Sequence, residues 1–141
     1  MIKIEVNRVD DAYAFEALDS NGHIVRMDAG ADIGGHDSGI RPMQLLLMAL
    51  ASCSGIDIVS ILKKQRQELT GLKMTVEGER EQGKEPALWK YIHLKFLFSG
   101  NIDEEKAIKA CALSMDKYCS VAATLRAAGC TIEWDVEMAH S

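Results

Sequence analysis

The sequence RPMQLLLMALASCSGIDIVSILKKQRQ, residues 41–67, predicts a long helix that decides the fold. Pro42 suits the first turn of a helix, because the N–H that proline lacks would have no partner there. Residues 45–51 are apolar on every side, and such a helix is expected to be buried. The apolar run is shorter than the ~20 residues that a membrane span needs. We therefore expect the core helix of a soluble protein, with Cys53 near its middle.

The segments around this helix predict an α+β domain with antiparallel sheets packed around a long buried central helix. Alternating apolar and polar residues indicate half-buried strands, and Asn21-Gly22 indicates a hairpin turn between two of them. The expected strands cover residues 2–6, 12–18, 23–28, 72–81, 88–98 and 131–138. The resulting order is βββ-α-ββ-αα-β, and a length of 141 residues predicts a single domain, 1–141.

The helix boundaries are predicted from capping signals. The central helix is expected to end near Thr70. Asn101 is expected to cap the next helix, with Glu104 completing a capping box. Residues 116–118 interrupt the apolar stripe of that helix, so a second, shorter helix is expected over 120–128.

Composition narrows the function classes. The net charge is −5 without a compensating basic cluster, which argues against nucleic acid and anionic membranes as partners. The N-terminal residues lack the apolar stretch of a signal peptide, so we expect a cytoplasmic protein. A central helix that is apolar all round also needs more cover than one small chain supplies, which predicts a homodimer.

The four cysteines, at positions 53, 111, 119 and 130, lack the close pairing of a zinc site, so no metal is expected. Cys111 and Cys130 are interpreted as small buried hydrophobic residues. Cys119 stands at a helix start, where backbone N–H groups and the helix dipole favour a thiolate. Position alone leaves two alternatives open for Cys53 and Cys119, a redox pair or two inert thiols. Asp57, one turn after Cys53, is expected to hold a backbone amide or a basic side chain.

The residues from Arg41 to Leu62 resemble the central helix of the OsmC/Ohr family, and most closely its YhfA-like branch. That helix opens with a Pro-Glu-[Glu/Gln]-Leu motif and carries a cysteine ten residues after the first Glu, the spacing of Met43 and Cys53 here. Cys119, followed by Ser-Val-Ala, matches the family's second cysteine. The resemblance covers nearly the whole chain and implies an intertwined homodimer with active sites at the dimer interface.

The resemblance also implies a thiol-dependent peroxidase that reduces organic hydroperoxides without a cofactor. Cys53 would be the peroxidatic thiolate and Cys119 the resolving thiol. The resulting disulfide would be reduced by an external dithiol, of the dihydrolipoyl type.

The family's peroxidases use an Arg, supported by the motif Glu, to stabilise the thiolate. Met43 stands at the Glu position here, so Arg41 is expected to substitute, with Gln44 as a neutral orienting group. Arg8 and Arg26 are further candidates.

Two other functions stay open on the same residues. Met43 favours a non-catalytic protein of this fold that binds a small apolar ligand at the dimer interface, whereas the two cysteines favour the enzyme. A purely structural domain with buried thiols is the third alternative.

Overall fold

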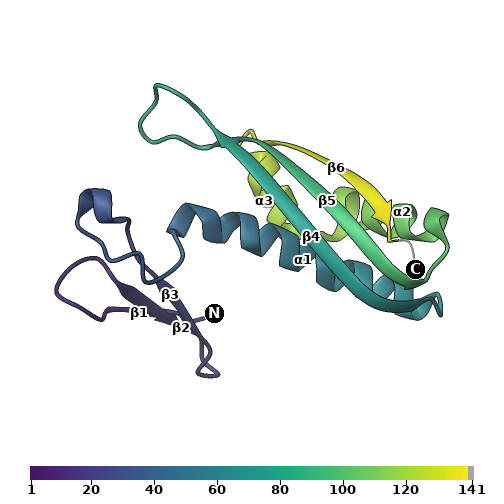
Figure 1. Ribbon diagram of the computed structural model, residues 1–141, viewed down its shortest axis with the longest axis horizontal. Coiled ribbons are helices and arrows are strands. Elements are labelled where there is room, and N and C mark those ends of the chain that lie inside the picture. The colour runs from purple at the N-terminus through teal and green to yellow at the C-terminus, as the bar shows by residue number, and fades with distance from the viewer. Residues whose placement is uncertain (140–141) are drawn as a thin grey trace. The chain divides into compact units, whose positions relative to one another are not determined.

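The computed structural model describes residues 1–139 and confirms the α+β class and the order of elements (Figure 1). Two compact units are present, residues 1–46 and a second unit that begins at Leu47, and the single domain stays a prediction. The strands are β1 (Glu5–Arg8), β2 (Phe15–Leu18), β3 (Ile24–Met27), β4 (Glu68–Arg80), β5 (Trp89–Asn101) and β6 (Thr131–Met138). The helices are the 3₁₀ turn η1 (Ala31–Ile33), α1 (Pro42–Lys64), α2 (Glu104–Leu113), the π-helical turn η2 (Ser114–Tyr118) and α3 (Ser120–Ala127).

The first unit is built on an antiparallel sheet in the order β1-β2-β3. The predicted turn joins β2 to β3, with Gly22 at a φ of 83°. Asp28, at the end of β3, organises the loop that follows: its carboxylate accepts hydrogen bonds from the Ser38 hydroxyl at 2.7 Å and from the backbone N–H groups of Ser38 and His36. These bonds, that from the Ser38 side chain above all, hold the pKa of Asp28 well below its usual range.

The second unit carries a sheet in the order β4-β5-β6, with the three α-helices against one face (Figure 1). β4 pairs with β5 antiparallel, but β5 pairs with β6 in parallel, so the expectation of purely antiparallel sheets is wrong for this pair. The chain between β5 and β6 passes through α2, η2 and α3, which gives the long crossover that parallel neighbours require.

Helix α1 ends at Lys64, well before the predicted end near Thr70. Arg66 adopts a left-handed conformation, with a φ of 58°, and the Gln67 N–H donates to the Leu62 carbonyl at 3.0 Å. This pattern terminates a helix and is usually formed with glycine, which explains why the sequence did not reveal it.

Only one face of α1 is buried within the described chain, so the prediction of burial on all sides is wrong for a single chain. The buried residues fall one turn apart: Leu50, Ser54, Ile58 and Leu62, with Gly55 beside them. They join a core formed with β5, α2, α3 and β6, because one sheet and one helix pair can cover only one side. On the opposite side Ile56 is 72% exposed. By length and hydropathy alone, α1 also satisfies the test for a membrane span, which core helices of soluble proteins pass as well.

The start of α2 differs from its prediction in the capping residue. Asn101 is the last residue of β5, and Asp103 caps the helix by accepting a hydrogen bond from the Glu105 N–H at 2.9 Å. A carboxylate at this position accepts a hydrogen bond from an N–H that would otherwise lack a partner. Its negative charge also interacts favourably with the positive end of the helix dipole.

Candidate active site

Cys53 lies on α1 beside the buried stripe and is half-buried. It packs against the core of the second unit and precedes the fully buried Ser54. The Cys53 thiol is therefore directed toward the core of the second unit and not toward open solvent.

Cys119 lies at the junction between the π-helical turn η2 and α3. The predicted interruption at residues 116–118 is this turn, in which the helix widens instead of breaking. The Cys119 N–H donates to the Ser114 carbonyl at 2.8 Å, and its own sulfur accepts a hydrogen bond from the Ala122 N–H at 3.4 Å. Cys119 thus caps α3 with its thiol. π-Helical turns are rare and are frequently found at functional sites.

The fold brings the two cysteines together with Asp57. The Cys53 sulfur, the Cys119 sulfur and a carboxylate oxygen of Asp57 all lie within 4.8 Å of one another. Cys53 and Asp57 occupy successive turns of α1, and Cys119 is supplied by the start of α3. A disulfide has a sulfur–sulfur distance of about 2.05 Å, so small movements of the two side chains would close the remaining gap.

The environment of Cys119 keeps its thiol protonated near neutral pH. Burial above all, with a smaller contribution from the adjacent Cys53 sulfur, raises the pKa of Cys119 to about 11 against the opposing effect of the Ala122 N–H. The helix start therefore acts on the sulfur as expected, but the prediction of a favoured thiolate is wrong because desolvation outweighs it. A protonated thiol here is suited to supply a proton as well as a sulfur.

The remaining cysteines lie elsewhere in the core. Cys111 and Cys130 are both buried, as predicted, and burial raises the pKa of Cys111 to about 12. Burial also raises the pKa of Cys130, although Arg126 counteracts it in part. Neither belongs to the group formed by Cys53, Asp57 and Cys119.

A buried polar network holds Asp57 in place. The Ser114 hydroxyl donates to an oxygen of Asp57 at 2.9 Å and lies 3.2 Å from the Ser54 hydroxyl. Both serines are fully buried, and together they join α1 to the first residue of η2. The expected partner of Asp57 was an amide or a basic side chain, and the observed partner is the Ser114 hydroxyl instead.

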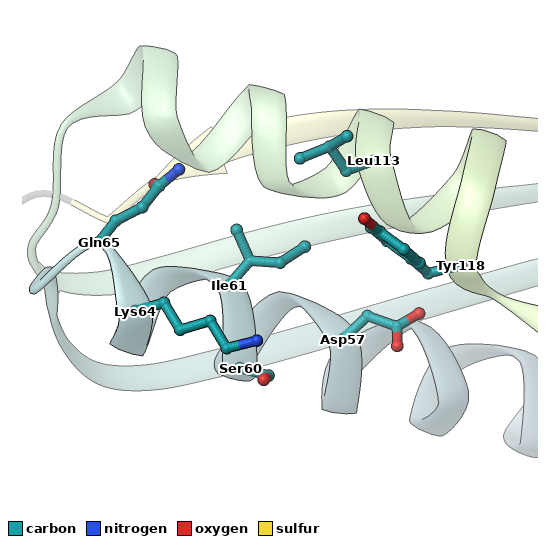
Figure 2. Close-up of a pocket in the computed structure, with 7 residues that line it drawn as sticks. All are labelled: Asp57, Ser60, Ile61, Lys64, Gln65, Leu113 and Tyr118. Atoms are coloured by element: carbon teal, nitrogen blue, oxygen red, sulfur yellow. The ribbon is translucent and has the colours of Figure 1, made fainter.

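A cavity of about 410 Å³ lies next to Asp57, between α1 and the end of α2 (Figure 2). The Ile61, Leu113 and Tyr118 side chains give it apolar walls, and the Lys64 side chain extends toward Asp57, with its ammonium group beside Ser60 (Figure 2). Asp57 belongs both to the cavity and to the thiol cluster, so the two adjoin at this residue.

The predicted supporting residues belong to the first unit. Arg41 donates to Asp37 at 2.9 Å and to the Gly39 carbonyl at 3.2 Å. Met43 is half-buried and Gln44 is exposed in the first turn of α1. Their roles beside Cys53 stay predictions.

Sequence reasoning missed Ser54, Ser114 and the chemistry of Asp57 as a third member of the cluster. Ser54 carried a signal, since it is a polar residue on a helix face that is otherwise apolar, next to Cys53. Ser114 carried none, because its partners lie on another helix. Cysteine spacing in the sequence likewise could not reveal a group of side chains that only tertiary structure brings together.

Comparison with known proteins identifies relatives over most of the chain. A family model described as OsmC-like protein matches residues 35–135. The chain is 35% identical to the protein YhfA of Escherichia coli strain K12 over 119 residues, which span 84% of this chain and 85% of that protein.

Solved structures share the same fold. A hypothetical protein from Aquifex aeolicus VF5 is 32% identical and gives a TM-score of 0.81, with 99% of this chain and 98% of that chain covered. An organic hydroperoxide resistance protein OsmC from Legionella pneumophila gives a TM-score of 0.69 at 15% identity, with 99% of this chain and 97% of that chain covered. The second likeness concerns the fold alone.

Proposed function

The chain belongs to the family of OsmC-like proteins, and on this basis we propose that it is a thiol peroxidase that reduces organic hydroperoxides through Cys53 and Cys119. The observation that carries the proposal is the approach of the two sulfurs to within 4.8 Å from two different helices. The Legionella structure that shares this fold is named an organic hydroperoxide resistance protein.

The proposed reaction has three steps. The Cys53 thiolate attacks the O–O bond of the hydroperoxide and becomes a sulfenic acid, and the departing alkoxide takes up a proton to leave as the alcohol. The Cys119 sulfur then attacks the sulfenic sulfur, and its proton leaves with the hydroxyl group as water. An external dithiol reduces the Cys53–Cys119 disulfide and is itself oxidised to a disulfide.

The cavity beside Asp57 supports an organic substrate. Ile61 and Leu113 offer apolar contacts to the carbon chain of a hydroperoxide, and hydrogen peroxide itself would gain nothing from them. Burial of Cys119 excludes water from the second step and so favours condensation with its thiol.

A homodimer is part of the proposal. The exposed face of α1 carries Met48, Ile56 and Val59, and the last two line a groove together with Leu72 and Met74. An apolar surface of this kind on a central helix is stabilised when a second copy covers it. Sedimentation velocity at micromolar protein is expected to give twice the chain mass, and a monomer mass would contradict the dimer.

The cellular setting follows from the same chemistry. As an OsmC-like protein the chain is soluble, and α1 is a core helix. We propose a cytoplasmic location, where thiol-reducing systems keep cysteines free and can supply the dithiol.

A second candidate function is the binding of a small apolar ligand without catalysis. Met43, at the position of the motif Glu, favours it, because a thioether cannot orient an arginine toward a thiolate.

Steady-state turnover of cumene hydroperoxide with dihydrolipoamide tests the proposal against this alternative. We expect turnover by the wild-type protein, loss of it in Cys53→Ser, and retention in Cys111→Ala, whose thiol lies outside the cluster. Glutathione, a monothiol, is expected to support a slower reaction than the dithiol. Equal rates for the wild-type protein and Cys53→Ser would rule out the peroxidase.

A further inference from the structure

Cys53, Asp57 and Cys119 present two sulfurs and a carboxylate oxygen to a common point, with all three atoms within 4.8 Å of one another. We propose that this cluster, in the reduced protein, is also a binding site for a thiophilic divalent cation of the Zn²⁺ type.

The ligand atoms lie near the spacing that Zn²⁺ requires. With zinc–sulfur bonds of about 2.3 Å, two sulfurs on a tetrahedral ion stand roughly 3.8 Å apart. The three atoms lie close enough to reach this arrangement through small side-chain rotations. Two thiolates also favour zinc over calcium or magnesium, which prefer oxygen ligands.

Two of the three ligands are already oriented by hydrogen bonds of the kind found around metal centres. The Ser114 hydroxyl donates to one oxygen of Asp57 at 2.9 Å, and the Ala122 N–H donates to the Cys119 sulfur at 3.4 Å. Such outer contacts fix the geometry of the ligands and raise metal affinity. Ser114 is fully buried, so its hydrogen bond is shielded from competing water.

With the cation bound, the site keeps one excess negative charge and leaves one coordination position free. Binding releases the proton of each thiol, and the resulting two thiolates and one carboxylate surround a doubly charged cation. Three protein ligands leave a fourth tetrahedral position open, as in zinc sites that exchange ligands. Because Asp57 also lines the cavity, water or a small anion can approach from that side.

Metal binding and peroxide reduction would exclude each other. A cation bound to the two sulfurs occupies the electron pairs with which Cys53 attacks the peroxide and Cys119 attacks the sulfenic acid. Conversely, once the metal has dissociated, two thiolates, one hydroperoxide and two protons give a disulfide, an alcohol and water, and a disulfide no longer binds the metal. This redox coupling rests on the proposed function, whereas metal binding by the reduced protein does not.

The test is a competition between reduced full-length protein and a chromogenic zinc chelator under anaerobic conditions. We expect one Zn²⁺ per chain, an absorption spectrum of thiolate-ligated tetrahedral cobalt when Co²⁺ replaces it, and loss of both signals in Cys53→Ser and Cys119→Ser. Asp57→Asn is expected to lower the affinity at least about tenfold, and Ser114→Ala about tenfold. Cys111→Ala and Asp116→Asn are the matched controls, because they change a buried thiol and an exposed acid outside the cluster.

The outcomes separate this proposal from the peroxidase. If zinc binding is absent, or equally strong in Cys53→Ser with native circular dichroism, the metal site is wrong even where peroxide still produces the disulfide. If the wild-type protein binds zinc but peroxide produces no disulfide, the metal site stands and the peroxidase fails. If both stand, saturating zinc is expected to slow disulfide formation at least tenfold. No slowing would overturn the shared site.

Discussion

Cys111 lies on α2 and Cys119 caps α3. Both are almost fully buried, and desolvation raises their thiol pKa values, to about 12 and about 11. Their surroundings nevertheless differ. Burial is the cause acting on Cys111, whereas Cys119 also adjoins the Cys53 sulfur, Asp57 and the Ala122 N–H. The π-helical turn η2 lies between the two cysteines and sets the direction in which α3 starts.

This comparison teaches that neither burial nor pKa identifies the candidate active thiol in this protein. The distinguishing property is a second sulfur atom nearby, which the turn at residues 114–118 and helix α1 bring close to Cys119. A reactive thiol pair can thus be built from groups that would each be inert in isolation.

Straightening the π-helical turn is expected to have the largest effect. Deleting Lys117, which is exposed, would restore α-helical spacing and turn Cys119 away from Cys53. Because misplacing a reacting group by about 1 Å can cost a hundredfold in rate, we expect disulfide formation with peroxide to slow at least about a hundredfold. Stopped-flow tryptophan fluorescence measures the rate, and Lys117→Ala is the length-matched control. An unchanged rate would show that the turn does not position Cys119.

Removing the Ser114 hydroxyl is expected to have the next largest effect. Ser114→Ala leaves the Asp57 carboxylate without its buried donor, and losing a hydrogen bond to a charged group costs about 2 kcal/mol. Urea unfolding should show a lower free energy of unfolding for this variant. Ser120→Ala, at an exposed site beside Cys119, should stay within about 0.5 kcal/mol of the wild type. Equal losses in the two variants would remove the special role of the network.

Alkaline pH should reveal the buried thiol of Cys111. Its pKa is about 12 when folded and near the ordinary 9.0 when unfolded, so the unfolded chain loses this proton first as pH rises. The free energy of unfolding therefore falls between about pH 9 and pH 12, by up to about 1.4 kcal/mol per pH unit from this thiol. Cys111→Ala should show a shallower decline in urea unfolding at several pH values. Parallel curves for the two proteins would contradict the assignment.

The smallest expected effect concerns the influence of Cys53 on its partner. Because the Cys53 sulfur helps to raise the pKa of Cys119, Cys53→Ser should lower that pKa and speed alkylation of Cys119 severalfold at mildly alkaline pH. Alkylation of Cys111 in the same samples should be unchanged, and peptide mass spectrometry reports both sites. Unchanged alkylation of Cys119 in Cys53→Ser would mean that the Cys53 sulfur does not raise the pKa of Cys119.

The sequence predicted the features that depend on local pattern. The element order, the interruption at residues 116–118 and the burial of Cys111 and Cys130 all follow from periodicity and composition, and they are confirmed. The family resemblance is confirmed as well. The pairing of Cys53 with Cys119 was left open by position and was implied only by that resemblance.

The remaining features depend on contacts between distant segments. Alternation along β6 is the same whether its neighbour is parallel or antiparallel, so the parallel pairing with β5 could not be read from it. The Ser114 hydrogen bond to Asp57 spans two helices, and the exposed side of α1 depends on how much of the helix one sheet can cover. No local pattern encodes these quantities.

The most direct test of the two-cysteine mechanism is intact mass after the reduced protein receives one equivalent of cumene hydroperoxide. We expect the loss of two hydrogens in the wild-type protein and in Cys111→Ala, and no such loss in Cys53→Ser or Cys119→Ser. We also expect a sulfenic acid at Cys53, trapped by dimedone, in Cys119→Ser. An unchanged wild-type mass at stoichiometric peroxide would contradict the peroxidase and favour the apolar-ligand protein.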